Sequence, residues 1–117
     1  MHVLSLGKPL PFLDDPVFSG EVKKRPLVSP EDSELIRSSE VTFQAGGRTK
    51  FHHHAGDQIL IITNGHGRVG TREEEFDVRA GDVVFIPHDE IRWHGATDDT
   101  VMTHISVITP GEEIIHE

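Results

Sequence analysis

Three histidines and a glutamine, all of which can bind a metal ion, lie close together in the segment HHHAGDQ. It contains His52, His53 and His54, with Gln58 four residues after the last histidine. On a β-strand successive side chains point to opposite faces, so His52 and His54 share one face and His53 lies on the other. Two imidazoles on one face can bind one ion, and an amide oxygen can complete part of the shell. The pattern predicts a site for Mn, Fe, Zn or Ni, without selecting among them.

Three further residues downstream have types that suit the same site. In the segment RWH, strand alternation places Arg92 and His94 on one face and Trp93 on the other. His94 is therefore the candidate fourth metal ligand. His104, in MTHIS, is expected to point into the same interior. Imidazole exchanges protons near neutral pH, so a histidine that binds no metal can act as a general acid or base.

The elements that must position these residues are expected to be short β-strands. Segments rich in β-branched and aromatic residues recur every ~8–12 residues after Ser39, which is typical of a β-sandwich or barrel. No segment there has helical periodicity over three turns. The run 58–63 is expected to be a buried strand, and Asn64-Gly65 is expected to form a hairpin turn. The expected strands are 39–43, 58–63, 67–70, 74–78, 83–86, 91–96 and 101–109.

The first part of the chain has a different character. Pro9, Pro11 and Pro16 exclude a long helix in the first ~20 residues. Residues 1–38 are therefore expected to form an N-terminal arm and edge segments that pack on a barrel of residues 39–117, within one domain overall. Residues 29–35 could form one helical turn or a loop.

Composition limits the class of partner. The chain has 117 residues, no cysteine and a formal net charge of −9. An acidic surface disfavours nucleic acids and anionic membranes as partners, and the missing thiols exclude disulfides and thiolate metal sites. The start of the sequence does not resemble a signal peptide, so a cytoplasmic location is expected.

The spacing of these residues resembles the cupin family. Its first motif, G(x)5HxH(x)3–4E(x)6G, is matched by Gly46, His52, His54, Gln58 and Gly65, with glutamine in place of glutamate. The second motif is matched only in its first half, by Gly81 and Pro87, and it departs from the pattern at Asp89, Arg92 and Ala96.

A narrower resemblance comes from GRTKFHHHAGDQ, GDVVFIP, WHGAT and MTH. Together they are similar to small cupins associated with carboxymuconolactone decarboxylase and to bacterial manganese-dependent cupin hydroxynitrile lyases. This resemblance implies an all-β jelly-roll barrel, and it implies that His52, His54 and Gln58 bind metal. It places Arg92 at a histidine ligand of the family, and His104 at a pocket position.

Arg92 leaves three alternatives open, because a guanidinium donates hydrogen bonds but cannot bind a metal. His94 can replace the missing ligand. His52, His54 and Gln58 can hold the ion alone with weaker affinity. Alternatively, the site is metal-free and Arg92 binds an anion.

The function expected is that of a metal-dependent, lyase-like enzyme acting on a small carbonyl or hydroxy compound. The metal would act as a Lewis acid, His104 as general acid or base, and Arg92 would hold a substrate carboxylate. The alternatives are a non-catalytic or metal-free binding module using Arg92 and Gln58, and an iron-dependent dioxygenase. A homodimer formed by arm exchange or sheet pairing is also expected.

Overall fold

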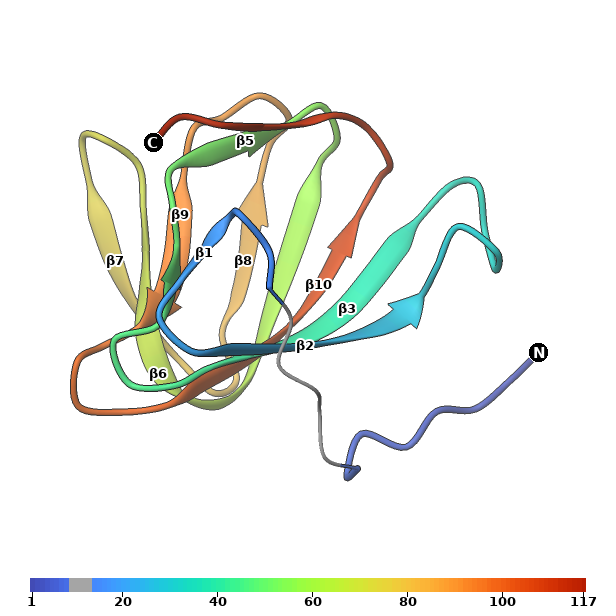
Figure 1. Cartoon of the computed structure of the whole chain (residues 1–117), viewed down its shortest axis with the longest axis horizontal. Helices are drawn as coiled ribbons and strands as arrows, with labels where there is room; N and C mark the ends of the chain where they lie inside the picture. The colour runs from blue at the N-terminus through green and yellow to red at the C-terminus, as the bar shows by residue number, and fades with distance from the viewer. Residues whose placement is uncertain (9–13) are drawn as a thin grey trace.

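The computed structural model describes residues 1–8 and 14–117 and contains only strands and loops (Figure 1). Within these residues there is no helix, and so none that could span a membrane. The all-β, jelly-roll expectation is confirmed. The strands are β1 (Phe18–Ser19), β2 (Val22–Val28), β3 (Arg37–Phe43), β4 (Arg48–Thr49), β5 (His52–His54), β6 (Gln58–Gly70), β7 (Glu75–Arg79), β8 (Val83–Ile86), β9 (Trp93–Ala96), β10 (Met102–Ile108) and β11 (Glu113–Ile115).

One long strand, β6, belongs to both layers of the barrel. Its first half pairs with β10 and β8, and the sheet continues through β3 to β2. Its second half pairs with β7 and β9, and that sheet continues through β4 to β1. The short strands β5 and β11 form a separate pair across one end (Figure 1). The two sheets are therefore joined by hydrogen bonds through one shared strand, β6.

The expected hairpin at Asn64-Gly65 is wrong, because β6 runs through this pair without reversing. Gly65 has a φ of 69°, and the pairing with β10 shifts register beside it. A Cβ at Gly65 would collide with the carbonyl oxygen of Val101, so glycine is needed for the close approach as well as for the dihedral angle. The left-handed conformation bends the strand from one sheet into the other, and the chain reverses only after residue 70, before β7.

The core lies between the two sheets. Phe43, Leu60 and Met102 are each 0% exposed. The expectation that the whole run 58–63 is buried is wrong, because Ile59 and Ile61 face outward with 40% and 37% exposure. Alternation along β6 sends every second side chain to the outer face. The buried apolar cluster consists of Val22, Val41, Phe43, Leu60, Ile62, Val69, Val78, Ile86 and Met102.

The N-terminal segment contributes edge strands. β1 and β2 are the terminal strands in the order β1-β4-β9-β6-β10-β3-β2. Residues 1–8 are exposed and contain no strand. Residues 29–35 form turns and bends, with a single i→i+4 hydrogen bond from the Ser33 N–H to the Ser29 carbonyl. Pro9 and Pro11, which support the expectation of an extended arm, lie outside the described residues.

Candidate functional site

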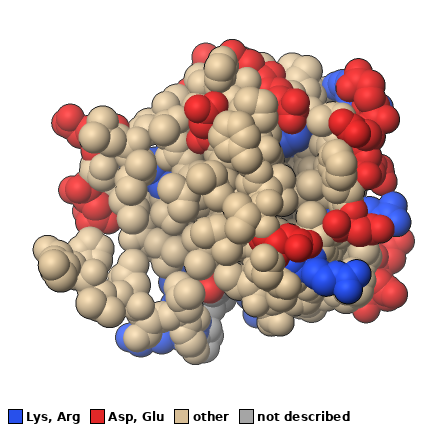
Figure 2. All heavy atoms as spheres, turned by 180° about the vertical axis from the view of Figure 1, so that it is seen from behind, with Lys and Arg blue, Asp and Glu red and all other residues tan. Residues whose placement is uncertain are grey.

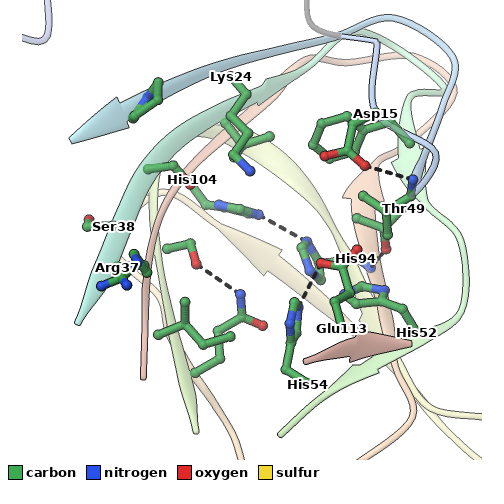
Figure 3. A pocket seen from close by; sticks show the side chains of 18 of the residues that line it. Asp15, Lys24, Arg37, Ser38, Thr49, His52, His54, His94, His104 and Glu113 are labelled. Carbon is green, nitrogen blue, oxygen red and sulfur yellow. Dashed lines mark hydrogen bonds and ion pairs between the residues drawn. The ribbon is translucent and has the colours of Figure 1, made fainter. Parts of the chain in front are cut away.

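A pocket of about 330 Å³ opens between the sheets at the end covered by β5 and β11. The structure brings five residues singled out in the sequence to its wall. They come from four strands, β5, β6, β9 and β10 (Figure 3). These five residues are His52, His54, Gln58, His94 and His104.

Strand parity places the three consecutive histidines as the sequence predicts. His52 and His54 line the pocket, and their ring centroids lie 5.0 Å apart. His53 points the other way, and its Nδ1 lies 2.7 Å from Nε2 of His116. The Nδ1 of His52 lies 2.8 Å from the carbonyl oxygen of Lys50. A carbonyl only accepts, so this contact places the His52 proton on Nδ1 and leaves a lone pair on Nε2.

Gln58 is held between a cation and a hydroxyl group. Arg92 Nη2 donates to Gln58 Oε1 over 2.8 Å, and Gln58 Nε2 donates to Ser106 Oγ over 2.9 Å. Arg92 itself is 2% exposed, and its Nη1 donates to the carbonyl oxygen of Glu90. It does not line the pocket and reaches it through Gln58. The predicted grip of Arg92 on a substrate carboxylate stays a prediction.

His94 and His104 form a buried pair. His104 Nε2 lies 3.0 Å from His94 Nδ1, and the two residues are 1% and 4% exposed respectively. The ring of Phe43 packs edge-on against both, with centroid distances of 5.3 Å to His104 and 5.9 Å to His94. The backbone N–H of His94 donates to Thr49 Oγ1, which fixes β9 beside β4. Packing and hydrogen bonds thus hold both rings in one arrangement.

Burial makes every histidine of the pocket a neutral imidazole at pH 7. Desolvation lowers the pKa of His52 to about 4, of His54 to about 3 and of His104 to about 4. It lowers the pKa of His94 well below the usual range, helped by the neighbouring His104. Burial also lowers the pKa of Arg92, to about 10, which leaves the guanidinium charged at pH 7.

Glu113 is a pocket residue that the sequence reasoning missed. It lies on β11, which pairs with β5 and brings Glu113 Oε2 to 3.5 Å from His54 Nε2. Because His54 is neutral and burial raises the pKa of Glu113, this contact is weaker than an ion pair. Asp15 and Lys24 also line the pocket (Figure 3). A strand of three residues after Pro110-Gly111 gives little alternation from which β11 could have been predicted.

The donor set does not fit a divalent metal ion as it stands. Among the described residues, no three histidine or acidic side chains converge so that they could hold an ion. The amide oxygen of Gln58 already accepts a hydrogen bond from Arg92, whose charge would repel a dication. His94 Nδ1 is engaged by His104, although its buried Nε2 finds no partner among the described side chains.

Comparison with known proteins agrees with this fold. Residues 39–108 match the family model described as Cupin domain. The chain is 41% identical over 93 residues to (R)-mandelonitrile lyase of Granulicella tundricola, covering 77% of this chain and 70% of the relative. A cupin-like protein of Thermotoga maritima superposes with a TM-score of 0.89 and 31% identity, covering 96% of this chain and 88% of that one. The polyketide cyclase RemF of Streptomyces resistomycificus shares the fold, with a TM-score of 0.85, 15% identity and coverage of 100% and 85%. The chain therefore belongs to the cupin family.

Proposed function

We propose that this protein is a lyase-like cupin that makes or breaks a bond beside the hydroxyl- or carbonyl-bearing carbon of a small molecule. The observation that carries the proposal is the buried pair of neutral imidazoles, His94 and His104, in the wall of the pocket between the two sheets. The relative named (R)-mandelonitrile lyase supports this reaction class. Proton transfer by the pair is the chemistry that the side chains can supply.

The proton count of the pair supports this role. The hydrogen bond between His104 Nε2 and His94 Nδ1 uses one N–H and one lone pair. Two neutral rings then have one further N–H and one further lone pair, shared between His94 Nε2 and His104 Nδ1. Neither atom finds a partner among the described side chains. Buried polar groups are rarely left unsatisfied, so the pair has a proton donor and a proton acceptor that no described side chain uses.

A divalent ion, Mn, Fe, Zn or Ni, is the candidate cofactor that the family and the lyase relative suggest. When bound, such an ion would act as a Lewis acid on a substrate oxygen. Because the residues in this arrangement do not fit it, the proposed steps use only the side chains.

In the cleavage direction, the free imidazole lone pair of the His94–His104 pair takes the proton of a substrate hydroxyl. The oxygen electrons form the carbonyl, and the electron pair of the breaking bond leaves with the departing group. The N–H at the other end of the pair then returns a proton to that group. The pair ends with the number of protons with which it began, and no oxidant or reductant is consumed.

The experiment measures turnover of a panel of small 2-hydroxynitriles, including mandelonitrile. The rate of aldehyde release is the readout. Replacing His94 or His104 by glutamine should lower kcat by about 10²–10⁴-fold, the usual contribution of general acid–base catalysis. The control is His53→Gln, from the same histidine run but facing away from the pocket, which should leave kcat unchanged. Binding without turnover would favour a non-catalytic module. Turnover that survives both pocket substitutions would refute the assignment.

We also propose that the protein forms a homodimer through an apolar face on the outside of β6 and β8. This face consists of Ile59, Ile61, Val83 and Phe85, with exposures from 37% to 66%. Pairing of β6 with β8 sets Ile59 beside Phe85 and Ile61 beside Val83. Two copies of a protein with net charge −9 repel each other, and this repulsion is smallest when they meet at a surface without charged side chains. Figure 2 shows how acidic side chains gather around the edges of one side of the molecule.

Light scattering during size exclusion tests the dimer. Phe85→Glu should convert it to a monomer. Phe76→Glu should not, because that side chain is equally apolar and 52% exposed but lies on β7. A monomeric unmodified chain, or a dimer that survives Phe85→Glu, would contradict this proposal.

A further inference from the structure

We propose that the guanidinium of Arg92 is a built-in substitute for the divalent metal of the family's site, so that the pocket of this chain works without binding a metal ion.

The backbone fixes Arg92 directly beside the first pocket histidine. The N–H of His52 donates to the carbonyl of Arg92 over 3.0 Å, and the N–H of Arg92 donates to the carbonyl of His52 over 2.9 Å. This antiparallel bridge leaves little freedom for either backbone to slide. Among the described residues, Arg92 is also the largest fully buried side chain. The bridge therefore fixes the backbone from which the buried guanidinium extends.

The hydrogen bonds of the guanidinium occupy an oxygen that a metal would need. Gln58 is the residue that the motif spacing places as a metal ligand, and its Oε1 accepts from Arg92 Nη2 over 2.8 Å. Ser106 then fixes the orientation of the amide by accepting from its Nε2. Hydrogen bonds therefore run from Arg92 to Gln58 and from Gln58 to Ser106. The Gln58 amide suits this position better than a carboxylate would, because it accepts from Arg92 and also donates to Ser106.

The charge of Arg92 also opposes metal binding. Arginine stays protonated, and no carboxylate forms an ion pair with Arg92 among the described residues. The buried charge therefore acts as a fixed monocation behind the pocket wall, in contact with Gln58. It repels a second cation strongly, since screening is weak in a buried environment. Arg92 thus supplies a positive charge next to the neutral pocket imidazoles without a metal ion.

The test is metal binding, which needs no assay of turnover. Unmodified protein and His54→Ala are treated with chelator, dialysed against Mn²⁺, Zn²⁺, Ni²⁺ or, without oxygen, Fe²⁺, and analysed for metal per chain. The expected result is the same metal content in both, because any ions then bound lie outside the pocket. His53→Gln identifies ions held on the surface by the His53–His116 contact. One equivalent of metal in the unmodified protein that His54→Ala removes would overturn the proposal.

A gain-of-binding variant sharpens the test. Arg92→His restores a ligand type and frees Gln58, so it should bind about one ion per chain, and that ion should raise its melting temperature. The gain should disappear in the double variant with His54→Ala. If Arg92→His folds and binds no more metal than the unmodified protein, Arg92 is not what excludes the ion, and the proposal fails. If that variant does not fold, the comparison of unmodified protein with His54→Ala still decides.

Discussion

Lowering the pH from 7.5 to 5.5 should destabilise the protein by several kcal/mol, because the pocket histidines resist protonation when folded. The folded-state pKa values of His52, His54 and His104 are about 4, 3 and 4, against an ordinary value of 6.5. Between these values the unfolded chain binds more protons than the folded one, so stability rises with pH. The full stability is present above pH 6.5, and it is lost progressively as the pH falls from 6.5 towards 4.

The magnitude follows from the proton linkage. At pH 5.5, protonation stabilises each unfolded histidine by about 1.4 kcal/mol, whereas a folded group with a pKa of 4 or below gains almost nothing. The three residues together give a loss of about 4 kcal/mol, and His94 acts in the same direction. Glu113 acts in the opposite direction, because its raised pKa favours the folded state at lower pH. A typical domain has only about 5–15 kcal/mol to lose.

The assay is guanidinium chloride unfolding at pH 7.5 and 5.5 at matched ionic strength, with extrapolation to water. His104→Gln should reduce the pH-dependent difference by about 1.4 kcal/mol. His2→Gln, in the exposed N-terminal segment, should leave it unchanged. Equal stability at the two pH values, or greater stability at pH 5.5, would refute the view that buried neutral imidazoles dominate the site.

Three further substitutions test the packing around the site, each measured as a change in the free energy of unfolding. Leu60→Ala, which empties a fully buried core position, should cost about 2–5 kcal/mol, and a cost under 1 kcal/mol would contradict the assigned core. Gly67→Ala should destabilise strongly, because its Cβ would collide with a backbone carbonyl of β9. Gly7→Ala, whose Cβ would meet no atom of the described residues, should be neutral. Thr49→Val leaves the buried backbone N–H of His94 without an acceptor and should cost about 1–3 kcal/mol. An unchanged free energy of unfolding would show that this hydrogen bond does not hold β9 in place.

Local periodicity was sufficient to predict which histidines of the run face the pocket. Alternation along β5 separates His52 and His54 from His53 without any tertiary information. The same reasoning failed at Asn64-Gly65, because a positive φ serves a strand bend as readily as a hairpin turn. Sequence pattern does not distinguish the two.

The contacts that determine the chemistry of the site were not predictable from periodicity. Arg92 and Gln58 are 34 residues apart, and their hydrogen bond depends on how β5 bridges the segment before β9. Glu113 reaches the pocket only through a three-residue strand whose pattern is too short to read. The motif spacing marked Arg92 as a departure from the family pattern, but only the fold shows that Gln58 is its partner.

The passage of β6 through both sheets has a consequence for how the protein opens. In a sandwich whose layers share no strand, one layer can separate while the other stays paired. Here the amides of one continuous strand are bonded on both sides in each layer, to β10 and β8 and then to β9 and β7. Hydrogen exchange should therefore find Leu60 and Val69, from opposite ends of this strand, protected to the same degree and released in a single cooperative event.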